Sequence, residues 1–207
     1  MTHTLHRRGT EESLEQDFVV LAMGARGVNR DGCAPKIRQI LEIMSRHNPV
    51  NYGDVFTGNS ITSHVDKMAT NIRENTVAHA VFRSEEDLVR FLNEMRETDV
   101  GLSIVVSGIF EHVHKCCHKA QLEPHTVNTS LGIHGRTDKL PEQPVLEIAT
   151  MCGHAMISYN LIRRAVSDIR AGSVTARDAA RKLAANCHCG IFNWERAERI
   201  LTAMAAK

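Results

Sequence analysis

Short apolar runs alternate with helix-period patterns along the first two thirds of the chain. Short β-rich runs bounded by turn residues predict strands, and apolar residues that recur every three or four positions predict helices. The predicted strands are residues 18–23, 77–82, 101–106, 126–133 and 145–149. The predicted helices in this part are residues 36–46, 63–73, 84–96 and 109–120. This alternation favours a sheet layer covered by helices.

The last third of the chain has only helical patterns. The helices predicted there are residues 155–171, 175–185 and 194–206. We therefore expect an α/β (or α+β) fold, in which a small mixed sheet with flanking helices is followed by a C-terminal helical subdomain. The expected organisation is a flexible tail over residues 1–16, an α/β region over 17–150 and a helical subdomain over 151–207, all packed as one unit.

Composition narrows the choice of partners. The chain has 207 residues, of which 43% are apolar, and this is enough for one substantial core. Lys and Arg total 25 against 24 for Asp and Glu, so the net charge of +1 gives no reason to expect a nucleic acid or an anionic membrane as partner. No apolar run has the length of a signal peptide or a membrane span. We expect a cytoplasmic protein with a small-molecule partner, and a homo-oligomer remains open.

Metal ligands are abundant, with 6 cysteines and 12 histidines in the chain. The most specific feature is a pair of clusters, Cys152-Gly153-His154 and Cys187-His188-Cys189-Gly190, at the two ends of a predicted helical hairpin. Because an antiparallel hairpin brings its two ends together, these clusters should meet. The predicted metal ligands are Cys152, Cys187 and Cys189, with His154 or His188.

Three thiolates and one imidazole suit zinc or an iron–sulfur cluster. The positive end of the helix predicted from residue 155 should stabilise a thiolate at Cys152. A glycine directly after Cys152 and another after Cys189 let the backbone fold closely around an ion. Two alternatives stay open. The cysteines can pack as small buried hydrophobic residues, or they can act as metal-free reactive thiols.

A second concentration of potential ligands covers residues 111–118, where His114 and His118 would share one face of a helix. However, Ile109, Val113 and Cys116 form a core stripe that leaves the histidines on the solvated side. We therefore expect a structural helix here, and a second metal site is the weaker alternative.

Several loops have the composition of an anion site. The glycine-rich loop 24–32 carries Arg26 and Arg30 between a predicted strand and helix, where backbone amides and the helix dipole favour negative charge. Three further positions in such loops are predicted to bind the same anionic substrate: Ser107, Ser130 and Arg136. His134, beside Arg136, is the predicted catalytic acid or base.

These features lead to two functional hypotheses. The first is a metal-dependent enzyme, such as a lyase or hydrolase, whose zinc or iron–sulfur centre acts on a small anionic metabolite. The second is a non-enzymatic metal-binding or thiol-redox regulatory protein that uses the same cysteines. The first requires an open position at the metal, and the second does not.

Overall fold

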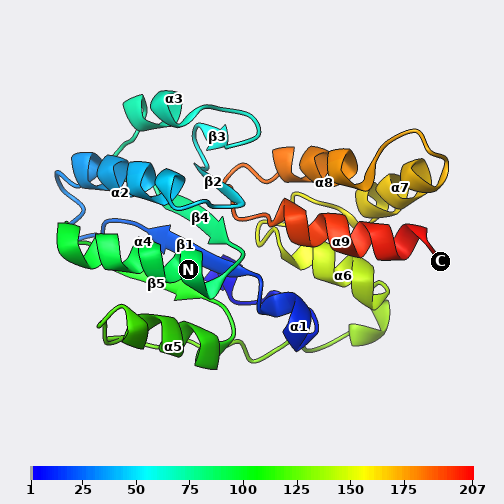
Figure 1. The fold of residues 1–207 in the computed structure, drawn as a ribbon, viewed down its shortest axis with the longest axis horizontal. Coiled ribbons are helices and arrows are strands. Elements are labelled where there is room, and N and C mark those ends of the chain that lie inside the picture. The colour runs from blue at the N-terminus through cyan, green and yellow to red at the C-terminus, as the bar shows by residue number, and fades with distance from the viewer. Residues whose placement is uncertain (1) are drawn as a thin grey trace.

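A computed structural model of the protein describes residues 2–207, in which helices cover both faces of a five-stranded sheet (Figure 1). The strands are β1 (Phe18–Ala22), β2 (Asn51–Asp54), β3 (Gly58–Asn59), β4 (Ala78–Phe82) and β5 (Ile104–Ser107). The helices up to residue 119 are η1 (Thr2–Thr4), α1 (Glu11–Leu14), α2 (Ala34–Arg46), α3 (Val65–Thr70), α4 (Glu85–Thr98) and α5 (Phe110–Lys119). The later helices are η2 (Thr137–Lys139), α6 (Gln143–Thr150), α7 (Tyr159–Arg170), α8 (Ala176–Ala185) and α9 (Trp194–Ala205). The expected α/β class is confirmed.

The strands lie in the order β3-β2-β4-β1-β5, and every neighbouring pair is antiparallel. Strands β1 and β2 are joined through α2 and run in the same direction with β4 between them. Strands β4 and β5 are joined through α4 in the same way, with β1 between them. These are two interlocked split β-α-β units. The central strands β4 and β1 are therefore the most protected part of the sheet.

Alternation along the central strands divides the interior into two cores. Phe18, Val20 and Ala80 point to the side covered by α2 and α4. Val19 and Val81 point to the opposite side, where they pack with apolar residues of α6 to α9. Because successive side chains of a strand point to opposite faces, the C-terminal helices cover one face of the sheet and α2 and α4 cover the other. Among residues 2–207, no helix is long and apolar enough to cross a membrane.

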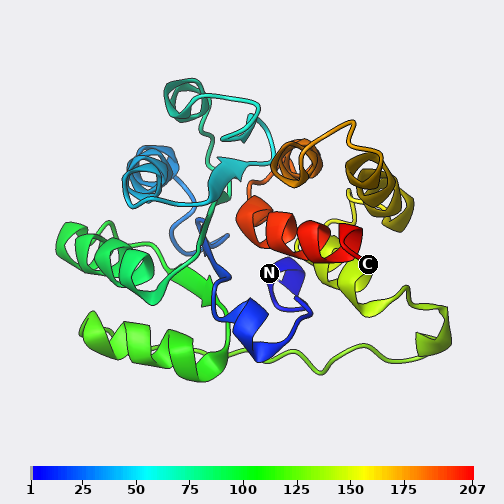
Figure 2. The same cartoon turned by 45° about the vertical axis from the view of Figure 1, so that its right-hand side comes forward.

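Two predicted strands are wrong. Residues 145–149 lie within helix α6, where Pro144 occupies the first turn and all five residues are buried. A short apolar run has the same pattern in a buried strand and a buried helix, so periodicity could not separate them. Residues 126–133 are exposed and pair with no strand in the described part of the chain. They belong to an extended segment that runs along the outside of the protein (Figure 2).

The N-terminal segment makes specific contacts with both layers, although its flexibility in solution stays a prediction. The hydroxyls of Thr4 and Ser107 are 2.7 Å apart, which joins η1 to β5. Arg7 donates to both carboxylate oxygens of Asp17 and also to the carbonyls of Met151 and Ile191. These bonds hold the segment between β5 and the two loops that carry the cysteines.

Asp17 is expected to make the stability of the protein sensitive to acid. Burial of its carboxylate opposes ionisation, but the charges of Arg7 and Arg196 outweigh burial and lower the pKa of Asp17. A carboxyl group whose pKa is lower in the folded state adds stability above its unfolded pKa of about 4, and this stability is lost as pH falls through the folded value. Urea unfolding from pH 7 to pH 2 should therefore give a steep fall in stability below about pH 4.

An Asp17→Asn variant should have a flatter pH dependence in this range, because asparagine cannot be protonated. Asp138→Asn is the matched control, since the Asp138 carboxylate is exposed in its ion pair with Arg136 and its contribution is screened by solvent. If Asp17→Asn and Asp138→Asn give the same pH dependence, Asp17 is not the group responsible.

Candidate metal centre

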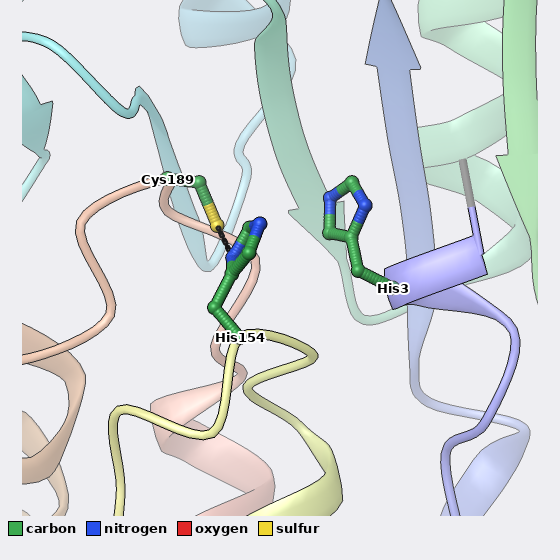
Figure 3. A group of neighbouring side chains, drawn as sticks. All are labelled: His3, His154 and Cys189. Carbon is green, nitrogen blue, oxygen red and sulfur yellow. Dashed lines mark hydrogen bonds between the residues drawn. The ribbon is translucent and has the colours of Figure 1, made fainter.

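The two predicted cysteine clusters meet beside the sheet. Cys152 and His154 lie in the loop between α6 and α7, whereas Cys187 and Cys189 lie in the turn between α8 and α9. Figure 3 shows Cys189 and His154 pointing toward each other, with His3 of the N-terminal segment close by. The hairpin of α7 and α8 brings its two ends together, as expected.

The glycines in these clusters serve contacts with other parts of the chain. A Cβ atom on Gly153 would lie 1.8 Å from the carbonyl oxygen of His3. Gly190 has a φ of +81°, and a Cβ there would lie 2.4 Å from the backbone of Tyr52 on β2. Any other residue would collide at either position. The glycines thus let the cysteine loops approach η1 and the sheet.

The three thiols lie next to one another. The neighbouring thiol of Cys187 and burial raise the pKa of Cys152. The Sγ atoms of Cys187 and Cys189 are 3.8 Å apart, which is within hydrogen-bonding distance for two thiols. This bond lowers the pKa of Cys189, although burial opposes the effect. Cys189 is therefore the thiol at this site that is most readily ionised.

The expectation of a thiolate at Cys152 is wrong. Helix α7 begins at Tyr159 with Ser158 as its N-cap, so no positive helix end lies at residue 155. Cys152 instead follows the C-terminal end of α6, where a helix disfavours negative charge. The neighbouring thiol of Cys187 and burial then raise the pKa of the Cys152 thiol.

Three imidazoles continue from the thiols into the sheet. Nδ1 of His154 is 3.6 Å from Sγ of Cys189, and the rings of His154 and His3 stack with centroids 4.6 Å apart. Nε2 of His3 is 3.1 Å from Nε2 of His79 on β4. Burial lowers the pKa of His3 to about 4 and that of His79 to about 3, and the neighbouring imidazoles add to both shifts. Both rings are neutral at pH 7, which is the form that binds metals.

The ligand atoms of His3, His154 and Cys189 all lie within 4.8 Å of one another. Around a tetrahedral zinc ion, bonds of about 2.3 Å to sulfur and about 2.0–2.1 Å to nitrogen place a sulfur and a nitrogen about 3.6 Å apart. The Cys189–His154 separation of 3.6 Å has this value. One thiolate and two imidazoles are therefore placed suitably for a single ion of zinc type.

The predicted ligands occupy different places around this group of three. Cys189 and His154 belong to it, and Cys187 contacts it through Cys189. Cys152 neighbours Cys187 and is not part of the group. His188 is exposed and is not part of the group.

His3 and His79 are members of the site that no sequence pattern predicted. His3 lies in a polar segment whose return to the cysteine loops depends on tertiary contacts, so no local pattern identifies it. His79 gave a weak signal, because it is the one polar residue in the strand Ala78–Phe82. A buried histidine in an apolar strand needs a hydrogen-bonding partner, which here is His3.

The predicted anion-binding residues are not brought together into one pocket. Arg26 is exposed in the loop after β1, and Arg30 in the same loop is half-buried. Arg136 is exposed, precedes η2 and binds Asp138 within it. Nε2 of His134 donates to the carbonyl of Leu131 within its own exposed loop. The roles of these residues in binding and catalysis stay predictions.

Ser107 and Ser130 both contact the N-terminal segment. Ser107 bonds with Thr4, and Ser130 lies 2.9 Å from Nδ1 of His6. Both bonded residues, Thr4 and His6, follow His3 in the N-terminal segment. The two hydroxyls help to hold this segment in place, and the role of Ser107 and Ser130 in binding a substrate stays a prediction.

Helix α5 has the orientation expected from its apolar stripe. Cys116 is buried, whereas His114 and His118 are exposed. His112 contacts Glu85, with 2.9 Å between Nδ1 and Oε1. His112 also forms a group with Glu11 and Glu15, but both carboxylates are exposed, which is common without a metal. This helix therefore has the ion pairs of an ordinary surface helix.

Comparisons with protein-family models, curated proteins and solved structures find no match to this chain.

Proposed function

We propose that this protein binds one transition-metal ion of zinc type through Cys189, His154 and His3, and that it is a metal-dependent enzyme acting on a small anionic molecule. The observation that carries the proposal is the convergence of these three ligand atoms within 4.8 Å from three separate parts of the chain. Thiolate and imidazole ligands together suit zinc.

The ligand set favours a catalytic ion over a structural one. Structural zinc sites are usually closed by four protein ligands, whereas catalytic sites have three and keep one position open. The tight group here has three ligands, and His154 on its outer side is exposed. The two apolar cores also give the fold a source of stability that does not depend on a metal.

The same ligand set favours zinc over an iron–sulfur cluster. Such clusters are usually held by four cysteine thiolates, and histidines replace two of them in one class. Only one cysteine belongs to the group of three, and Cys187 lies outside the group, with its Sγ 3.8 Å from that of Cys189. A single ion can bind to these three ligand atoms with less movement of the side chains than a cluster would require.

Charge supports an anionic substrate. A divalent ion held by one thiolate and two neutral imidazoles retains one net positive charge, which attracts an anion to the open position. When bound, such an ion supplies Lewis-acid chemistry of the kind used by lyases and hydrolases. Cys187 would keep the charge on Cys189 in place by its hydrogen bond, and His3 would hold the inner side of the site.

A second candidate is a metal-free reactive thiol. Its support is the contact between Cys189 and His154 and the lowered pKa of Cys189, because a cysteine beside a histidine is the usual arrangement of a nucleophilic thiol. Cys189 is only 1% exposed, however, and a substrate could not reach its sulfur without movement of the loops. An ion is small enough to bind there, and this favours the metal.

The proposal is tested with cobalt(II), which takes the place of zinc and reports its ligands by visible absorption. Protein purified without oxygen and freed of metal should bind one cobalt ion per chain, with an absorption band from a thiolate ligand. Acetate or phosphate should shift the visible bands by entering the open position. If one ion binds but anions do not shift the visible bands, the proposal of an enzyme is contradicted and a regulatory metal-binding protein is favoured. Failure to bind cobalt or zinc would overturn the metal centre.

A further inference from the structure

The three ligands of the proposed metal centre lie on three separate segments of the chain. His3 is in the N-terminal segment, His154 is in the loop between α6 and α7, and Cys189 is in the turn between α8 and α9. Such ligands bind one ion well only if their segments are held at a fixed spacing. A side chain that joins all three segments would therefore act directly on the geometry of the centre.

The guanidinium group of Arg7 makes bonds of this kind. Arg7 lies four residues after His3 in the same segment, and its side chain is 6% exposed. Its Nη1 donates to both carboxylate oxygens of Asp17, at 2.8 and 2.7 Å. Its Nη2 donates to the carbonyl of Met151, at 3.1 Å, and to the carbonyl of Ile191.

The two carbonyls that accept from Nη2 belong to the segments with the other two ligands. Met151 lies three residues before His154, and Ile191 lies two residues after Cys189. Because one nitrogen binds both carbonyls, the loop after α6 and the turn after α8 are joined to each other as well as to the N-terminal segment. Arg7 therefore connects all three segments that supply ligands.

Other bonds of the N-terminal segment have a different direction. The hydroxyl of Thr4 bonds with Ser107 on β5, and Arg196 on α9 donates to the carbonyl of Arg8 at 2.6 Å. These bonds attach the segment to the sheet and to a helix. The bonds of Arg7 instead attach it to the loops that carry ligands, so they have the closest relation to metal binding.

We infer that Arg7 is a positioning residue that holds the N-terminal segment against both cysteine loops, so that docking of this segment and binding of the metal are coupled. The inference rests on the metal centre proposed above. Arginine suits the role because its planar guanidinium donates from two terminal nitrogens in a fixed geometry. Coupling of this kind is reciprocal, so a bound metal must favour docking of the segment by the same factor as docking favours the metal.

The role of Arg7 is tested with two substitutions. Lysine keeps a positive charge for Asp17, but its ammonium is a single point and cannot occupy the positions of both terminal nitrogens. Methionine removes the charge as well. Arg7→Lys should therefore be more stable than Arg7→Met, whereas both should bind cobalt about 10–100-fold more weakly than wild type, as is usual when the support of a metal ligand is lost. Cobalt affinity is measured by competition with a chelator, and the stability of the metal-free proteins by urea unfolding.

Arg96→Lys is the control for these variants. Arg96 on α4 donates to the carbonyl of Ala120 at 2.8 Å, in the core under α2 and α4, and Arg96→Lys should bind cobalt as wild type does. Wild-type affinity in Arg7→Lys, or much weaker binding by Arg7→Met than by Arg7→Lys, would overturn the positioning role while leaving the metal centre intact. Absence of cobalt binding by the wild-type protein would overturn both.

A measurement on the wild-type protein keeps the coupling testable if the substitutions prevent folding. Trypsin cleaves after arginine, and the exposed Arg8 offers a cleavage site within the N-terminal segment. Zinc should slow cleavage after Arg8 by at least about 5-fold, which is the lower end of the usual coupling between two sites. Cleavage after the exposed Arg136 is the internal control and should keep its rate. If zinc does not slow cleavage after Arg8 relative to cleavage after Arg136, the coupling is contradicted.

Discussion

Replacement of Cys189 by alanine is expected to lower the affinity for cobalt or zinc by more than about 100-fold, since loss of a ligand should exceed the effect of losing a ligand's partner. Cys189 contacts both His154 and Cys187, and its pKa is lowered, so it is the thiolate on which the centre depends. The absorption band from the thiolate should also disappear. Competition with a chelator and visible spectra of the cobalt protein measure the two effects.

Cys33→Ala is the matched control. Cys33 and Cys189 are each 1% exposed, so both substitutions remove a buried sulfur of the same size. Cys33 lies in the core under α2 and α4, away from the histidines, and its thiol bonds with the backbone carbonyl of Glu74. Cys33→Ala should therefore keep the affinity and the band of the wild-type protein. Unchanged binding by Cys189→Ala would exclude Cys189 as a ligand and return attention to Cys152 and Cys187.

Local patterns were sufficient to predict most helices. Helices α2 and α4 have apolar residues at helical spacing, and Ser84 caps α4 through the backbone N–H of Asp87, as the sequence indicates. Asn193 caps α9 in the same way, through Arg196. These signals are local, because the cap and the stripe lie within one or two turns of the helix that they specify.

The pairing of strands and the full ligand set could not be predicted in this way. The two cysteine clusters were expected to meet because a hairpin joins them, and they do. His3 is separated from His79 by 76 positions, and their contact depends on how the N-terminal segment crosses the sheet. The run 145–149 shows the same limit, because tertiary packing decides whether a short buried run is a helix or a strand.

The N-terminal segment is held in this position by a buried ion network, so Arg196→Met should be strongly destabilising. The Arg196 side chain is 0% exposed and lies 2.7 Å from a carboxylate oxygen of Asp17 and 3.2 Å from one of Glu147. It also donates to the hydroxyl of Ser13 and to the carbonyl of Arg8. Removing one partner of a buried ion pair leaves the other charge uncompensated, which typically costs about 3–5 kcal/mol.

Arg177→Met provides the comparison for this loss in urea unfolding at pH 7. Arg177 also pairs with a glutamate, Glu198, on the C-terminal helices, but its side chain is 66% exposed. Solvent screens such pairs, so the loss of Arg177 should change stability by no more than about 1 kcal/mol.

Because Arg7 still neutralises part of the charge on Asp17, the uncompensated group in Arg196→Met is chiefly Glu147. Arg196→Met,Glu147→Gln should therefore regain part of the stability lost by Arg196→Met. A double variant that is less stable than Arg196→Met would show that lost packing, rather than unpaired charge, causes the effect.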